Sequence, residues 1–170
     1  DVSGEPMSDA VHEVTVARMR NAMLEAYAAG VAAVAGEPAT AAWLERHPLS
    51  GPTSVIALGK ASGAMARGAQ RVLGEDLASG LVVTKAGHAD VDGLTAANWQ
   101  VVESAHPVPD ERSLAAGQAV ADFVAAMPPD RPVLVLVSGG ASALVELLVE
   151  GITLDVLARV NAWLLSNGVP

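Results

Sequence analysis

The sequence of 170 residues has no cysteine, few basic residues and no long apolar run. Without cysteine there can be neither disulfide bridges nor thiolate metal sites, which fits a cytoplasmic protein. Lysine and arginine together number 10 against 19 acidic residues, and the formal net charge of -9 opposes binding to nucleic acid. No stretch reaches the roughly 20 apolar residues of a membrane-spanning helix. We therefore expect a soluble protein with neither nucleic acid nor a membrane as its partner.

The opening part of the chain predicts two helices. Ser8 is a suitable N-cap for a long helix over residues 9–35. A second helix over residues 38–46 would place Pro38 in its first turn, where the missing N–H does no harm. Residues 1–7 lack the basic and apolar regions of a signal peptide, and we expect them to form a flexible start.

Short apolar runs then alternate with helical segments. We expect strands at residues 54–58, 80–85, 99–103 and 132–137, and helices at residues 62–73, up to residue 126 and at residues 154–165. The run 54–58 is typical of a strand buried on both faces, and the run 132–137 is the most convincing buried strand. This alternation implies an α/β fold, a Rossmann-like three-layer sandwich with a mostly parallel sheet, preceded by a long helix. We expect residues 1–170 to form a single domain of this kind.

Every unusual turn falls at the carboxyl edge of the predicted sheet, where such folds bind their ligands. The turn after the last strand reads Ser138-Gly139-Gly140-Ala141-Ser142. Glycines let the backbone approach a ligand, and free amides at the start of a helix attract an anion, so this turn is a candidate phosphate or carboxylate cradle. A tight turn with serine caps explains the same residues equally well. The turn matches neither the P-loop nor the dinucleotide-binding glycine pattern.

Two lysines follow other predicted strands. Lys60 lies in the first strand-to-helix turn, where a lysine can neutralise the charge of a transferring phosphoryl group. Lys85 and His88 lie in the turn after the second strand and could contact a nucleotide or substrate. Taken alone, Lys60 could equally be a solvated lysine just beyond a strand. The turn with Lys85 and His88 could equally be an ordinary surface loop.

His106 stands between a weak strand and a helix, in a segment stiffened by two prolines, with Asp110 as the helix cap. It could act as an acid, a base or a hydrogen-bond donor, although a structural role is commoner for a lone histidine. The sequence predicts no metal site, since the histidines are not spaced as ligand pairs. Glu146 and Glu150, one helical turn apart, are expected on a solvated face.

Four motifs in fixed order resemble the type II glycerate kinases. They are Leu58-Gly59-Lys60-Ala61, the run from Gly80 to His88, the stretch from His106 to Glu111, and Ser138 to Leu144 followed by Glu150-Gly151-Ile152. The resemblance implies an enzyme that phosphorylates D-glycerate at its 2-hydroxyl to give 2-phosphoglycerate, using ATP and Mg²⁺, in a cleft between a Rossmann-like domain and a second domain. Some family members carry the label hydroxypyruvate reductase.

By the same resemblance, Lys60 looks like the catalytic lysine of the family. The implied phosphate-cradle positions are Ser138, Gly139, Gly140 and Ser142, and Lys85 and His106 correspond to further nucleotide- or substrate-binding positions. Ala141 stands where the family usually has a third glycine. Because such kinases are more than twice as long, we expect this chain to be the amino-terminal part of a two-domain enzyme. We expect it to be inactive alone, and to self-associate or contact the second domain.

Two other functions suit the same residues. An NAD(P)H-dependent hydroxypyruvate reductase is compatible with the α/β pattern, but the missing G-x-G-x-x-G turn argues against it. A non-catalytic module that binds a phosphorylated small molecule also suits these residues, because the Ser-Gly-Gly turn can bind phosphate without catalysing a reaction. Fold class alone does not decide among these functions.

Overall fold

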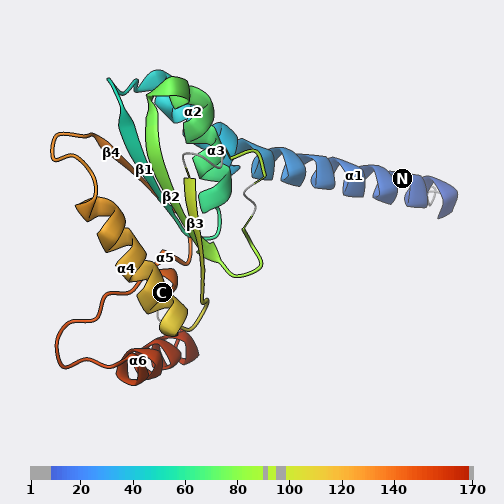
Figure 1. Ribbon diagram of the computed structural model, residues 1–170. Helices are drawn as coiled ribbons and strands as arrows, with labels where there is room; N and C mark the ends of the chain where they lie inside the picture. Colours follow the sequence, from blue (N-terminus) through green and yellow to red (C-terminus); the bar gives the residue numbers. More distant parts are fainter. Residues whose placement is uncertain (1–8, 90–91, 95–98, 169–170) are drawn as a thin grey trace. The chain divides into compact units, whose positions relative to one another are not determined.

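The computed structural model describes residues 9–89, 92–94 and 99–168, which fall into two units, Asp1–Ala35 and Gly36–Pro170. The first unit contains helix α1 (Asp9–Ala33), so the long opening helix is confirmed (Figure 1). Its expected cap Ser8 and the flexible start at residues 1–7 lie outside the described residues. No helix in the described part of the chain is long and apolar enough to span a membrane.

The described residues of the second unit are built on a parallel sheet of four strands (Figure 1). In chain order these are β1 (Thr53–Leu58), β2 (Leu77–Lys85), β3 (Trp99–Ser104) and β4 (Val133–Val137). In space the order is β3-β2-β1-β4, and all three pairings are parallel. The chain moves from β1 to β2 and β3 on one side, then returns to place β4 on the other side of β1. The strand order therefore reverses between β1 and β4, which is where ligands bind in open α/β sheets.

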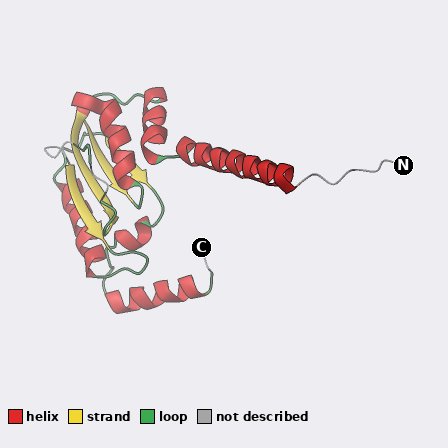
Figure 2. Ribbon diagram, turned by 90° about the vertical axis from the view of Figure 1, so that its right-hand side faces the viewer, coloured by secondary structure: helices red, strands yellow, loops and turns green. Residues whose placement is uncertain are grey.

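Helices cover both faces of the sheet, which confirms the three-layer sandwich (Figures 1 and 2). One face is covered by α2 (Gly36–Arg46) and α3 (Ser62–Leu73), and the other by α4 (Glu111–Ala125) and the short α5 (Ala141–Leu144). The two faces have separate cores. The first contains Leu44, Val55, Ala57, Ala66, Ala69, Leu77, Val82, Trp99 and Leu136, and the second contains Leu81, Val83, Ala116 and Leu144.

Shorter elements complete the second unit. A 3₁₀ turn, η1 (Gly74–Asp76), leads into β2. Helix α6 (Leu154–Ser166) follows Thr153, which caps it, because the Thr153 hydroxyl accepts the N–H of Val156 at 3.4 Å.

The burial predicted for the last strand is wrong. Val133, Val135 and Val137 on β4 are 41%, 54% and 60% exposed, whereas Leu136 on the opposite face is buried. Strand β4 lies at the edge of the sheet and pairs only with β1 among the described strands. Since side chains alternate along a strand, one face of β4 packs on the core containing Leu136 and the other is uncovered. An apolar run is typical of a buried strand, but its neighbours decide how much of it is buried.

Candidate anion-binding site

The turns after β1 and β4 are bonded to each other at the point where the strand order reverses. The N–H of Ser138 donates to the carbonyl of Leu58 at 2.8 Å, and the N–H of Lys60 donates to the carbonyl of Gly139 at 3.0 Å. Gly59 has a φ of 113°, and a Cβ there would lie 2.3 Å from Ser138 Oγ. Position 59 therefore requires glycine, because any side chain would push the two turns apart.

The Ser138 hydroxyl is part of this joint. It donates to the Leu58 carbonyl at 3.1 Å and accepts the N–H of Ala61 at 3.1 Å. Its proton is therefore engaged within the protein. By contrast, the N–H groups of Gly139 and Gly140 donate to no group in the described part of the chain. These two amides are the donors that the turn can offer to an anion.

The side chains of Lys60 and His106 both lie against the glycine pair. A Cβ on Gly140 would lie 2.7 Å from His106 Nε2 and 3.6 Å from Lys60 Cε, and one on Gly139 would lie 3.9 Å from Lys60 Cε. Gly140 also has a φ of 89°, which favours glycine. Ala141, where the family usually has a third glycine, has no positive φ and begins α5, so its methyl group meets no backbone strain.

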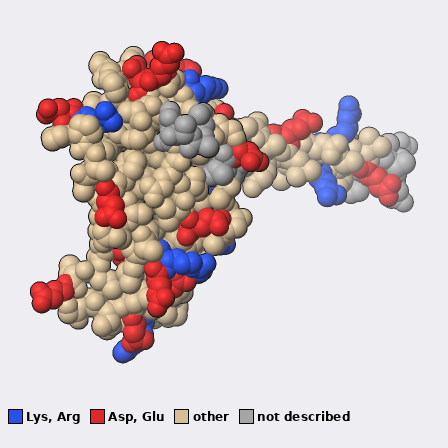
Figure 3. All heavy atoms as spheres, viewed as in Figure 1, with Lys and Arg blue, Asp and Glu red and all other residues tan. Residues whose placement is uncertain are grey.

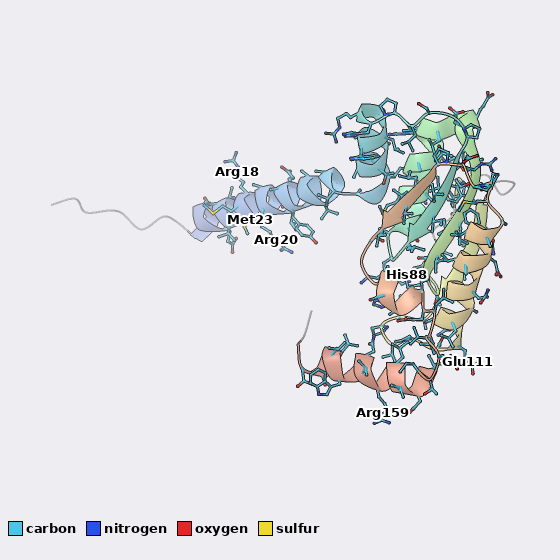
Figure 4. All side chains as sticks on the ribbon, turned by 90° about the vertical axis from the view of Figure 1, so that its left-hand side faces the viewer. Arg18, Arg20, Met23, His88, Glu111 and Arg159 are labelled. Atoms are coloured by element: carbon cyan, nitrogen blue, oxygen red, sulfur yellow. The ribbon has the colours of Figure 1, made fainter. Side chains whose placement is uncertain are left out.

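Lys85 is the last residue of β2, and the turn that follows it is hydrogen-bonded to β3. The N–H of Ala86 donates to the Ser104 carbonyl at 2.9 Å, and the N–H of Gly87 donates to Glu103 Oε1 at 2.9 Å. The N–H of His88 closes the turn on the Lys85 carbonyl at 2.9 Å. Figure 4 shows His88 at the end of the sheet where α5 lies.

The electrostatic environment of His106 shows that these turns converge. Burial lowers the pKa of His106 below its ordinary value of 6.5, and the charges of Lys60, Lys85 and His88 lower it further. The imidazole is therefore neutral at pH 7 and lies in a positive local field. On the face shown in Figure 3, acidic and basic side chains are scattered and form no large patch of either charge. A compact cationic site of this kind suits a small anion in an acidic protein.

We expect Lys60→Met to raise the pKa of His106 toward 6.5, because it removes the positive charge that acts most strongly on the imidazole. An NMR pH titration of the His106 ring protons measures this shift. Arg71→Met, at the other end of α3, should leave the titration unchanged.

The lowered pKa of His106 also makes stability depend on pH. Below pH 6.5 the unfolded chain binds more protons at His106 than the folded chain does. The free energy of unfolding should therefore fall as the pH drops from 6.5 through the lowered pKa. A His106 pKa at or above 6.5 in the unaltered protein would contradict this account.

The structure brings some of the predicted site residues together and leaves others apart. It brings together Lys60, His106, Gly139 and Gly140, with Ser138 in the joint beneath them. Lys85 lies within electrostatic range of His106. Ser142 lies on α5, is exposed, and makes no contact that would tie it to this cluster in the described residues.

The side chains of this site do not fit a magnesium ion. Mg²⁺ prefers oxygen ligands, especially carboxylates, and the site gathers two lysines and two histidines. No group of three histidine or acidic side chains in the described residues could hold a metal. The expectation that Glu146 and Glu150 share a helix face is wrong, because α5 ends at Leu144. Glu146 is partly buried, and burial raises the pKa of its carboxyl.

Two buried serines that the sequence did not single out connect these turns. Ser104 and Ser113 are both fully buried. The Ser104 hydroxyl donates to the Leu144 carbonyl and the Ser113 hydroxyl to the Ala143 carbonyl, each at 2.7 Å. The only sequence signal was the capping pattern at Asp110, which is confirmed, since Ser113 completes a capping box with it.

The chain thus contains a parallel α/β domain in which lysine and histidine side chains gather around a glycine pair where the strand order reverses. A family model described as a domain of unknown function, DUF4147, matches residues 22–170, and the chain belongs to this family.

Proteins similar to this chain include kinases. A D-glycerate 2-kinase from Thermotoga maritima is 37% identical over 116 residues, which are 67% of this chain and 27% of the relative. A glycerate 2-kinase from Pyrococcus horikoshii is 38% identical over 120 residues, 71% of this chain and 26% of the relative. A relative from Agrobacterium vitis with a provisional hydroxypyruvate reductase name is 40% identical over 114 residues, 67% of this chain and 29% of its own length.

A solved structure shares the fold. The crystal structure of glycerate kinase from Thermotoga maritima superposes with a TM-score of 0.77 at 32% identity, covering 90% of this chain and 36% of that chain. These similarities confirm the resemblance to the glycerate kinases that the motifs indicated. The chain spans only about a quarter to a third of the length of these relatives.

Proposed function

We propose that this chain provides the phosphate-binding edge of an enzyme that transfers a phosphoryl group from ATP to the 2-hydroxyl of D-glycerate, giving 2-phosphoglycerate. One observation carries the proposal: Lys60 and His106 both lie against Gly139 and Gly140, whose amides have no partner among the described residues, where the strand order reverses. The names of the relatives from Thermotoga maritima and Pyrococcus horikoshii support this reaction.

The donors at this edge suit the oxygens of a phosphoryl group. Phosphoryl transfer depends mainly on positioning and on the neutralisation of charge, and little covalent chemistry is left to the protein. In our proposal the amides of Gly139 and Gly140 bind phosphate oxygens while the Lys60 ammonium balances the charge that develops on them. Lys85 and the neutral His106 then hydrogen-bond the nucleotide phosphates or the glycerate. Mg²⁺ would take its ligands from other residues.

We further propose that these 170 residues alone do not catalyse the phosphorylation. The edge supplies cations and amides, and none of the side chains gathered there, Lys60, Lys85, His88 and His106, is a carboxylate. In our proposal, a base for the glycerate hydroxyl and the ligands of Mg²⁺ come from the remainder of a longer protein. Because the relatives extend well beyond the matched part, they have room for these groups.

A coupled assay of ADP formation tests this function on the longest natural protein that contains this chain, with D-glycerate and MgATP as substrates. We expect glycerate-dependent ADP release that falls at least about 100-fold in Lys60→Ala, since a positioned charge at the transferred group is lost. Arg71→Ala is the matched control, because it removes an exposed positive charge at the far end of α3. The 170 residues alone should release no ADP.

A parallel assay of NADH oxidation with hydroxypyruvate separates the kinase from a reductase, the activity suggested by the name of the Agrobacterium vitis relative. NADH oxidation without ADP release would overturn the kinase proposal. Phosphate binding with neither activity in the longer protein would favour a non-catalytic binding module.

A further inference from the structure

Two turns that belong to different crossovers of the sheet meet at Gly140. One follows β3 and carries His106, and the other follows β4 and carries the glycine pair. A Cβ on Gly140 would come within 2.7 Å of the imidazole, so the two turns approach each other closely. Among the described residues no hydrogen bond joins His106 itself to Gly140, so other contacts hold the two turns together.

The hydroxyls of Ser104 and Ser113 provide that contact. Helix α5 begins directly after Gly140 and ends at Leu144, which leaves its last carbonyls without partners inside the helix. The two hydroxyls donate to the carbonyls of Ala143 and Leu144 at 2.7 Å. Both serines are completely buried, so water cannot replace these bonds.

Both serines also make bonds to neighbouring segments. Ser104 lies two residues before His106, and its carbonyl accepts the N–H of Ala86 in the turn that carries Lys85. The Ser113 hydroxyl accepts the N–H of Asp110 at 3.2 Å, at the end of the His106 segment. The Ser113 carbonyl also accepts the N–H of Glu146 at 3.1 Å, just beyond α5. The two serines thus bond the segments that carry Lys85, His106 and the glycine pair to one another.

We propose that Ser104 and Ser113 are positioning residues of the phosphate-binding edge, which hold α5 and the preceding Gly139–Gly140 turn against His106. Neither hydroxyl reaches the ligand. They act through the carbonyls at the end of α5, so their loss lets the glycine pair move away from His106 and Lys60. This inference rests on the proposed function only in that the ligand of the edge carries a phosphate.

Inorganic phosphate is the probe, added to the full chain at fixed pH and constant ionic strength while the His106 imidazole signals are followed by NMR. We expect Ser113→Ala to weaken phosphate binding about tenfold and to move the His106 pKa toward its ordinary value. Ser104→Ala should act in the same direction, and Ser113→Cys, which keeps a weak donor of similar size, should fall between Ser113→Ala and the unaltered protein.

Ser54→Ala is the matched control. Ser54 is also completely buried and hydrogen-bonded, to the Ser79 hydroxyl at 2.9 Å, but it lies at the start of β1, at the opposite end of the sheet. It should lower the melting temperature without changing phosphate affinity or the His106 titration. Should Ser113→Ala fail to fold, Ser104→Ala and Ser113→Cys provide the same comparison.

Two results would overturn the proposal, for different reasons. If Ser113→Ala melts at a lower temperature but binds phosphate and titrates like the unaltered protein, the serines are structural only and the phosphate-binding edge stands. If the unaltered protein gives no response to phosphate, the binding edge itself is wrong, and the positioning role fails with it.

Discussion

Gly59→Ala should cause the largest loss of stability of any single methyl group added at the site. The new Cβ would lie 2.3 Å from Ser138 Oγ, 2.6 Å from the Ser138 carbonyl oxygen and 2.8 Å from its carbonyl carbon. Backbone strain at a φ of 113° adds about 1–3 kcal/mol to an overlap that costs about as much. We expect the free energy of unfolding to fall by about 4 kcal/mol, measured by urea denaturation, and phosphate binding to be lost.

Two variants separate the causes of this loss. Gly51→Ala is the control for backbone strain alone, since Gly51 has a φ of 76° and no atom within 4 Å of an added Cβ. It should cost only about 1 kcal/mol. The double variant Gly59→Ala with Ser138→Gly should remain unstable, because the backbone atoms of residue 138 still overlap the methyl group. Full recovery in the double variant would show that only the hydroxyl is in the way.

The alternation of strands and helices predicted the fold class but not the strand order. Each turn could be assigned to the carboxyl edge because all strands of a parallel sheet point the same way. Which turns would touch depends on strand order, and the contact between the Gly59 and Ser138 turns joins residues far apart in the sequence. The sequence therefore predicted Lys60, Gly139, Gly140 and His106 as candidates, while the approach of Lys60 to the glycine pair is a result of the β1–β4 pairing.

The same limit explains the error at β4 and the missed serines. The outer face of β4 is apolar enough for a buried strand at Val133, Val135 and Val137. Burial, however, also requires another segment to cover that face, which the residues of the strand itself do not reveal. Ser104 and Ser113 bond to carbonyls 40 and 30 residues away, so no local pattern marks them as more than a strand end and a helix cap. Only the structure reveals such buried hydroxyl contacts. Their partners are backbone carbonyls, which every residue type has, so the sequence of the partner gives no signal.

Gly117→Ala should also destabilise the second unit, although alanine is the better helix former. An added Cβ in α4 would lie 2.0 Å from the carbonyl oxygen of Glu146 and 2.7 Å from its carbonyl carbon. Backbone cannot rotate away as a side chain can, so α4 and the segment after α5 must separate, at about 3 kcal/mol. The gain in helix propensity is about 1 kcal/mol. The net loss of about 2 kcal/mol should appear in urea denaturation.

Gly30→Ala in α1 is the matched substitution, since Gly30 is also helical but has no atom within 4 Å of an added Cβ. It should increase helicity without destabilising the second unit. Because the Ser113 carbonyl accepts the Glu146 N–H, the shift caused by Gly117→Ala should also loosen the Ser113 contacts and weaken phosphate binding. A Gly117→Ala protein as stable as the unaltered one would mean that the segment at Glu146 yields freely. In that case it could not hold the glycine pair against His106, and Gly117→Ala would bind phosphate with unaltered affinity.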